Sequence, residues 1–113
     1  MKSLAFWIAL SGACAVAFGA FSAHGLHAAT AKDWVATGAH YQGLHAVAAL
    51  ILLNMGHKRA ALLLTIGATI FAATLYAMAL GAPTWLGAIT PIGGSLLILA
   101  WLSVAWRRWQ MRD

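Results

Sequence analysis

The sequence predicts an all-α, polytopic membrane protein: a four-transmembrane-helix bundle with its N and C termini in the cytoplasm. Of its 113 residues, 63% are hydrophobic and only 8% are charged, which is too little charge to cover a soluble domain of this size. The chain also holds four apolar runs that each approach the length of about 20 residues needed to cross a bilayer. We therefore expect residues 1–113 to form a single four-span membrane domain.

The first expected span covers residues 4–23. A cleaved signal peptide is the alternative, because residues 20–23 are similar to a cleavage site. Small side chains recur every four residues along one face of this run, and such a stripe lets a second helix approach closely. The stripe consists of Ser11, Ala15, Gly19 and Ala23. It favours a retained, packed helix.

Residues 24–33 form the connection to the second span. Gly25 is expected in the left-handed conformation that ends many helices, and Asp33 is expected to cap the second helix. Residues 28–32 are compatible with a short surface helix, but they are too few for the sequence to decide.

The second and third expected spans cover residues 35–54 and 60–80, with a tight turn at 56–59 between them. The third span carries a second stripe of small side chains: Thr65, Thr69, Ala73, Ala77 and Gly81. Because the first and third spans both carry such stripes, we expect both to make close helix contacts.

The fourth expected span covers residues 86–106, and Pro91 leaves its start open. The helix begins either at Thr90, with Pro91 in its first turn, or near Thr84, with a kink at Pro91. Residues 86–90 are expected at membrane depth, irregular or bent but covered by protein.

Basic residues predict the orientation of these spans. Three segments that a four-span topology places on one side carry six of them: Lys2, Lys58, Arg59, Arg107, Arg108 and Arg112. The other side carries only Lys32, so the positive-inside rule places both termini in the cytoplasm. The net charge of +5 is then a topology signal that also attracts anionic lipid headgroups, and no nucleic-acid partner is expected.

The chain is poor in the residues that catalysis requires. Its two acidic residues, Asp33 and Asp113, lie outside the expected spans, whereas paired-carboxylate hydrolysis, a magnesium or calcium site and a carboxylate proton relay all need acids. The sequence has no glycine-rich phosphate loop, and its single cysteine, Cys14, excludes an internal disulfide. The first interpretation is therefore a protein with no enzyme activity, no catalytic residues and no cofactor or metal.

Polar side chains concentrate in the first half of the second span, within nine positions: Thr37, His40, Tyr41, Gln42 and His45. Polar groups in hydrocarbon are costly unless they are hydrogen-bonded, so we expect this arc to face the interior. The first interpretation is a cluster of interhelical hydrogen bonds. Tyr41, Gln42 and His45 would bond hydroxyl groups, or carbonyl groups freed near Pro91, on other helices.

Two ligand hypotheses compete with this interpretation. Imidazole binds iron, copper and zinc, so His24, His40 and His45 are candidates to hold haem or a metal ion. His24 and His40 are expected at a matching depth near the outer boundary, with His45 about 7 Å deeper than His40. The other hypothesis is a lipid or quinone pocket lined by the same histidines with Tyr41 and Gln42.

Three motifs carry a resemblance to a known family. They are Gly-Ala-Phe-Ser-Ala-His-Gly-Leu at 19–26, Thr-Gly-Ala-His-Tyr-Gln at 37–42 with His-Ala at 45–46, and Leu-Gly-Ala-Ile-Thr-Pro-Ile-Gly-Gly at 86–94. The chain resembles the YgdD/YwdK-like inner-membrane proteins, a bacterial domain-of-unknown-function family with small mitochondrial relatives. The resemblance covers most of the chain. It implies a four-span bundle in the bacterial cytoplasmic (inner) membrane, and it implies no activity.

The resemblance also implies a set of family residues: His24, Tyr41, Gln42, His45, Thr90 and Pro91. Three departures accompany them. Ser22 replaces the usual glycine, His40 stands where a hydrophobic or basic residue is commoner, and residues 71–76 lack the usual serine and glycine. The last departure weakens the expectation of a polar contact from the third span.

The sequence therefore predicts a non-catalytic packing or accessory protein that self-associates or joins a larger membrane complex. The first alternative is a haem-, quinone- or lipid-binding bundle that uses the polar cluster. The second alternative is a small oligomeric transporter or channel.

Overall fold

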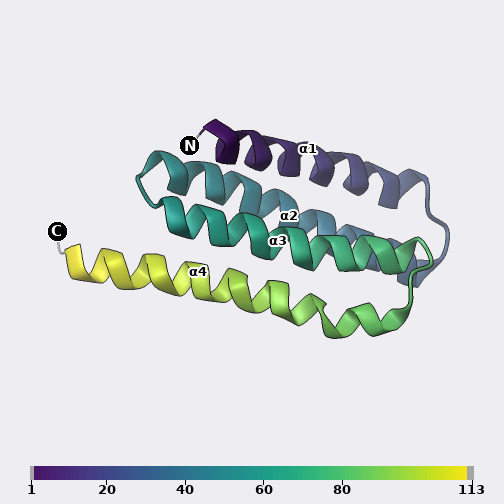
Figure 1. The fold of residues 1–113 in the computed structure, drawn as a ribbon. Helices are drawn as coiled ribbons and strands as arrows, with labels where there is room; N and C mark the ends of the chain where they lie inside the picture. Colours follow the sequence, from purple (N-terminus) through teal and green to yellow (C-terminus); the bar gives the residue numbers. More distant parts are fainter. Residues whose placement is uncertain (1, 112–113) are drawn as a thin grey trace.

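The computed structural model describes residues 2–111 and contains four long α-helices and one short 3-10 helix. These are α1 (Lys2–His24), α2 (Ala29–Asn54), α3 (Lys58–Ala79), η1 (Thr84–Ala88) and α4 (Thr90–Met111). The long helices lie side by side and alternate in direction, so the start of α1, the α2–α3 turn and the end of α4 share one end of the molecule (Figure 1). The all-α prediction is confirmed. The charge predictions that name Arg112, Asp113 and the side chain of Lys2 fall outside the described residues.

Three segments of the described chain are long and apolar enough to cross a membrane: Ser3–His24, Lys58–Ala79 and Thr84–Met111. Their hydropathies are 2.0, 1.9 and 1.8, and they correspond to the first, third and fourth expected spans. The helix α2 has a sufficient length of 26 residues, but its polar side chains lower its hydropathy. Length and composition therefore identify three spans in residues 2–111, and not four.

The connection between α1 and α2 is shorter than expected. Because α2 begins at Ala29, residues 29–32 form the start of this helix and not a separate surface helix. The prediction that Asp33 caps α2 is wrong, since Asp33 lies inside it, after a run of Ala and Lys that favours helix. The prediction for Gly25 is also wrong. Its N–H group donates to the Phe21 carbonyl at 2.7 Å, as in a helix, and the described glycines with positive φ are Gly56 and Gly81.

The helix α2 packs against both α1 and α3. On α1, Ser11 and Ala15 of the expected stripe are buried, whereas Ala23 is exposed and Ser22 is buried in its place. Since a helix has 3.6 residues per turn, a strict four-residue repeat drifts off the contact face. The contact therefore follows steps of both three and four residues.

The helix α3 makes the close contacts that were expected, with α2 and α4, but the expected stripe is not its main contact face, because Thr69 and Ala73 are exposed. The buried side of α3 consists of Ala60, Ala61, Leu64, Gly67, Ala68, Ala72, Thr74, Leu75, Tyr76 and Met78. The predicted set of contact residues is wrong because a repeat of small residues does not specify which face buries more apolar area. The large side chains Leu64, Leu75 and Met78 decide it.

Of the two alternatives for Pro91, the structure shows the first. The helix α4 begins at Thr90, so Pro91 lies in its first turn, where the missing N–H group has no helical acceptor to lose. None of the η1 residues is buried, so the expectation that protein covers this segment is wrong. Hydrogen bonds within the segment satisfy its backbone polar groups instead. The Leu86 N–H group donates to the Pro83 carbonyl at 3.2 Å, and the Ile89 N–H group donates to the Leu86 carbonyl at 2.9 Å.

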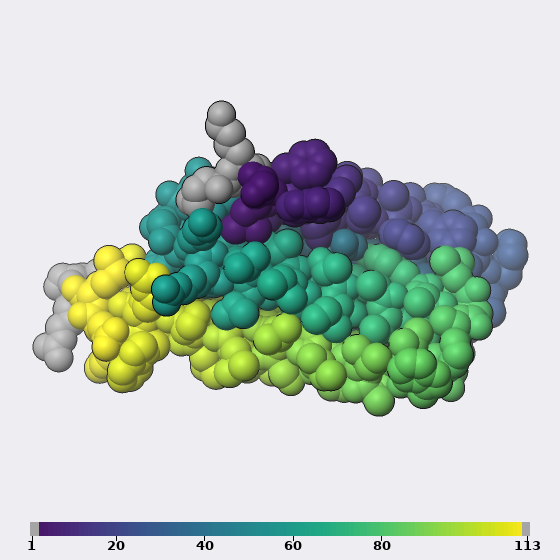
Figure 2. Space-filling model, viewed as in Figure 1, coloured from purple at the N-terminus to yellow at the C-terminus, as the bar shows by residue number. Residues whose placement is uncertain are grey.

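The helix α4 packs against α3 and lies apart from α1 and α2. Within residues 2–111, no Cα atom of α4 comes within 8 Å of a Cα atom of α1 or α2, and α3 separates α4 from α1 on the face shown in Figure 2. Gly67 and Gly93 bring α3 and α4 together: a Cβ atom on Gly93 would lie 2.6 Å from the Gly67 carbonyl oxygen and 2.5 Å from the Phe71 nitrogen. The four long helices thus share one core cluster, with the backbone of α4 close to α3 alone.

Gly93→Ala is expected to destabilise the protein by about 1–3 kcal/mol, because the new methyl group would collide with the α3 backbone. Gly94→Ala is the matched control. Its added Cβ atom would meet only Phe71 Cδ1, at 3.8 Å, and alanine favours a helix over glycine by up to about 1 kcal/mol. Unfolding in mild detergent measures both variants, and equal stability of the two would contradict the close α3–α4 contact.

Candidate functional site

The side chain of Gln42 joins three helices. It is only 6% exposed. Its Nε2 donates to Ser11 Oγ on α1 at 3.1 Å, and its Oε1 accepts from the Tyr76 hydroxyl on α3 at 2.7 Å. An interhelical hydrogen-bond network is therefore present around Gln42, and its partners are these two hydroxyl groups instead of carbonyls near Pro91.

Tyr76 is the member of this network that the sequence analysis missed. Its ring stacks on Phe18 of α1, with ring centroids 3.9 Å apart and an interplanar angle of 8°. On its α2 side Gly38 makes room, since a Cβ atom there would lie 2.8 Å from Tyr76 Cε1. A tyrosine in an apolar span carries a hydroxyl group that needs a hydrogen-bond partner. The presence of Tyr76 in the third apolar run was therefore the sequence signal that could have predicted its place in the network.

His45 and Tyr41 form a second group on α2. His45 is 5% exposed, and its Nδ1 lies 2.7 Å from the Tyr41 carbonyl oxygen. Only a protonated Nδ1 makes this bond, so the neutral imidazole keeps Nε2 as an acceptor. The Tyr41 ring is 41% exposed and lies parallel to the His45 ring, with centroids 6.0 Å apart.

These two residues line a hollow of about 340 Å³ between α2 and α4, which we call the α2–α4 groove. Its residues are Tyr41, His45, Phe71, Gly94, Leu97, Ile98 and Trp101. Phe71 forms its floor on α3, 4.9 Å from the Tyr41 ring centroid, and Trp101 reaches from α4 to 6.1 Å from the His45 ring. The groove exists because, within residues 2–111, the backbone of α4 lies close to that of α3 alone among the long helices, so only side chains reach from α4 to α2.

Thr37 and His40 do not face the interior, because both are exposed. At 100° per residue they lie about 140° and 160° around α2 from Gln42. The inward arc expected from Thr37 to Gln42 is therefore misplaced, and the buried side of α2 is centred on Gln42.

His24 and His40 do not lie at the matching depth that the haem hypothesis expected. Gly19 of α1 is level with Ala39 of α2, since a Cβ atom on Gly19 would lie 3.7 Å from Ala39 Cβ. His24 lies five residues beyond Gly19, which adds about 7 Å along α1. The expectation of matching depth is wrong because α2 begins at Ala29 and not at residue 35. In the part of the chain that the structure describes, no three His, Cys, Asp or Glu side chains gather to hold a metal ion.

Thr90 and Pro91 belong to another contact. Thr90 Oγ1 lies 2.6 Å from Thr74 Oγ1 and ties the start of α4 to α3. Pro91 is exposed. Thr90 therefore supports the position of α4, and neither residue bonds to Tyr41, Gln42 or His45.

Comparison with known proteins gives one family. Residues 18–94 match the family described as "Protein of unknown function (DUF423)". A UPF0382 membrane protein of Haemophilus influenzae is 42% identical and aligns over 88% of this chain and 87% of its own. The UPF0382 inner membrane protein YgdD of Escherichia coli is 32% identical over 88% and 84% of the two chains, and YwdK of Bacillus subtilis is 29% identical over 92% and 94%. No solved structure matches.

Gln42→Leu and Tyr76→Phe are each expected to destabilise the protein by about 0.6–2 kcal/mol, because each leaves a buried polar partner unbonded. The double variant is expected to lose less stability than the sum of the two single losses, because the second substitution removes the polar group that the first leaves without a partner. Tyr41→Phe is the control, as its hydroxyl group makes no hydrogen bond within residues 2–111. Unfolding free energies in mild detergent give the coupling, and strictly additive losses would contradict the network.

Proposed function

The chain belongs to the DUF423 family, whose relatives are named as membrane proteins, and from this premise we propose a non-catalytic accessory protein of the bacterial inner membrane. In this proposal all four long helices cross the membrane, and the α2–α4 groove receives a helix of a neighbouring subunit. That subunit is a second copy of the chain or a member of a larger complex.

The side chains of α2 support its role as the fourth span. The residues that lower its hydropathy include Gln42 and His45, which are buried and hydrogen-bonded. Beyond Thr37 and His40, which are exposed nearer its start, its outer side presents Leu44, Val47 and Ile51, which are 54%, 62% and 54% exposed. A helix with bonded polar groups inside and apolar groups outside suits a bilayer.

The charges support cytoplasmic termini. Lys58 and Arg59 begin α3, and Arg107 and Arg108 lie in the last turns of α4, at the same end of the molecule (Figure 1). Lys32 lies at the start of α2, at the other end. The positive-inside rule assigns the more basic end to the cytoplasm.

One observation carries the proposed association. His45 lines the α2–α4 groove, and its Nε2 has no hydrogen-bond partner in the described chain, whereas its Nδ1 has one. A polar atom at membrane depth costs free energy unless it is bonded. A neighbouring helix in the groove would supply a donor to Nε2 and cover Tyr41 and Trp101.

A small ligand in the same groove is the second candidate. The volume of about 340 Å³ falls in the range of ligand sites, which are mostly apolar with a few polar groups. A quinone or a lipid would pack on the aromatic rings of α2, α3 and α4, and the Tyr41 hydroxyl group would donate to a quinone carbonyl. The haem hypothesis and the transporter hypothesis stay predictions.

Ile98→Cys in a Cys14→Ala background is expected to form a disulfide-linked dimer in native membranes, because Ile98 lines the groove and is 61% exposed. Leu99→Cys is the matched control, since it has a similar exposure of 56% but lies about 100° around α4. Non-reducing electrophoresis after mild oxidation measures the dimer.

A crosslink from Ile98→Cys to a different protein would favour the larger complex over self-association. Slow maleimide labelling of Ile98→Cys that becomes fast after removal of lipid, without any crosslink, would favour the small ligand. Equal crosslinking of the Ile98 and Leu99 variants would argue against the groove as the contact.

A further inference from the structure

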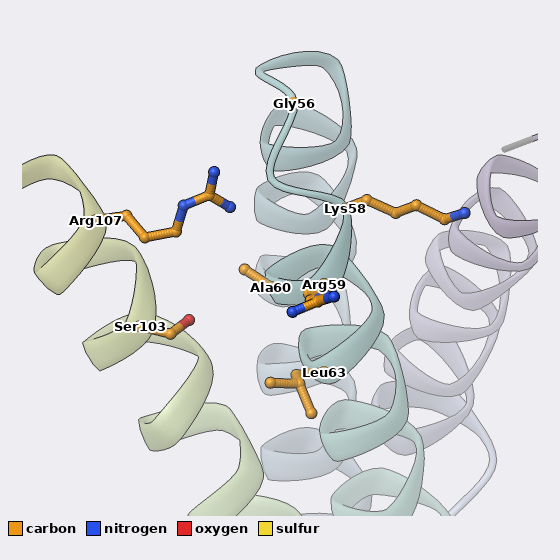
Figure 3. Close-up of a pocket in the computed structure, with 7 residues that line it drawn as sticks. All are labelled: Gly56, Lys58, Arg59, Ala60, Leu63, Ser103 and Arg107. Atoms are coloured by element: carbon orange, nitrogen blue, oxygen red, sulfur yellow. The ribbon is translucent and has the colours of Figure 1, made fainter. Parts of the chain in front are cut away.

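A second hollow lies at the basic end of the molecule, between α3 and α4, with a volume of about 640 Å³. We call it the α3–α4 cleft; Arg59, Ala60 and Leu63 of α3 and Ser103 and Arg107 of α4 line it. In Figure 3 the Arg107 side chain extends from α4 toward α3, whereas Lys58 extends away toward α1. The cations that line the cleft are thus Lys58, Arg59 and Arg107, and the two that carry guanidinium groups are Arg59 and Arg107.

The described chain has no carboxylate near these two cations. Between residues 2 and 111 the acidic residue is Asp33, in the second turn of α2, and α2 begins at the opposite end of the molecule (Figure 1). Two cations beside one hollow repel each other, so an anion between them is stabilising. Guanidinium groups suit phosphate in particular, because two parallel N–H donors match two phosphate oxygens.

From the end of the molecule inward, the side chains change from cationic to apolar, in the order in which a phospholipid changes from headgroup to acyl chain. Leu63 lies one helical turn inward from Arg59, and Ser103 one turn inward from Arg107, each about 5.4 Å farther from the end. Leu99, another turn inward on α4 and beyond the residues that line the cleft, is apolar and 56% exposed. Cations at the rim and exposed apolar side chains deeper down suit a headgroup followed by acyl chains.

We propose that the α3–α4 cleft binds the phosphate headgroup of an anionic phospholipid in the cytoplasmic leaflet. Arg59 and Arg107 hold the phosphate, and the small side chains of Ala60 and Ser103 leave room for it. The proposal rests on the membrane orientation proposed above, since that orientation brings the cleft to headgroup level.

Native mass spectrometry of the purified protein, titrated with phosphatidylglycerol in mild detergent, tests the site. Arg107→Gln is expected to weaken binding about fivefold, and Arg59→Gln combined with Arg107→Gln about 25-fold. Arg107→Lys keeps the charge and is expected to retain most of the binding. Arg108→Gln is the matched control: it removes the same charge from the next position, whose guanidinium points to Met111 Sδ at 3.7 Å and does not line the cleft.

Equal weakening by Arg107→Gln and Arg108→Gln would overturn the proposal, because diffuse surface charge would then explain the binding. Equal affinity for zwitterionic phosphatidylcholine would overturn it as well. Displacement of the lipid by millimolar inorganic phosphate would assign the cleft to a free anion instead. Labelling of Arg108→Cys in spheroplasts by a membrane-impermeant maleimide reports the orientation of the protein. The Ile98→Cys crosslink reports the association with a neighbouring subunit. A failure of lipid binding is therefore distinguished from a failure of the proposed orientation or association.

Discussion

The requirement that a buried amide be hydrogen-bonded governs the arrangement of α1, α2 and α3. Gln42 has a donor and an acceptor to satisfy, and it finds one partner on each neighbouring helix. These two bonds have defined directions, whereas apolar contacts among Ala, Leu and Ile side chains do not. The network therefore adds a directional constraint to the rotation and register that apolar burial favours for these three helices. Gly38 and Phe18 then hold the Tyr76 ring at the angle that the bond requires.

The approximate helix positions were predictable because their signals are local, although the start of α2 was placed at residue 35 instead of Ala29 and the start of α4 was left open. Apolar runs, the turn at Gly56 and the position of Pro91 each act within a few residues of chain. The inward orientation of Gln42 followed from the cost of an amide in hydrocarbon. Its partners did not follow, since Ser11 and Tyr76 meet it only after the rotation of α1 and α3 is known. The exposed stripe on α3 shows that spacing alone does not supply that rotation.

The open position of α4 was not predictable from composition, because four apolar helices are compatible with closed and open arrangements alike. A contact between Gly67 and Gly93 decides the matter by bringing two backbones together at one side of α3. Leu97 and Ala100 then join the common core, while no Cα atom of α4 within the described chain comes within 8 Å of one of α1 or α2. Both hollows follow from this placement. The α2–α4 groove lies between α2 and α4, over Phe71 of α3. The α3–α4 cleft lies between the basic ends of α3 and α4, beside Ala60.

The same placement has a consequence for biosynthesis. Ser11, Gln42 and Tyr76 all precede Gly93 in the chain, so the ribosome delivers every member of the Gln42 network before it delivers the residue that docks the last helix. Every hydrogen-bond partner in the Gln42 network is therefore present once α3 has been synthesised. The fourth helix then docks late, against a surface that is already formed, and it is the segment whose arrival completes the molecule.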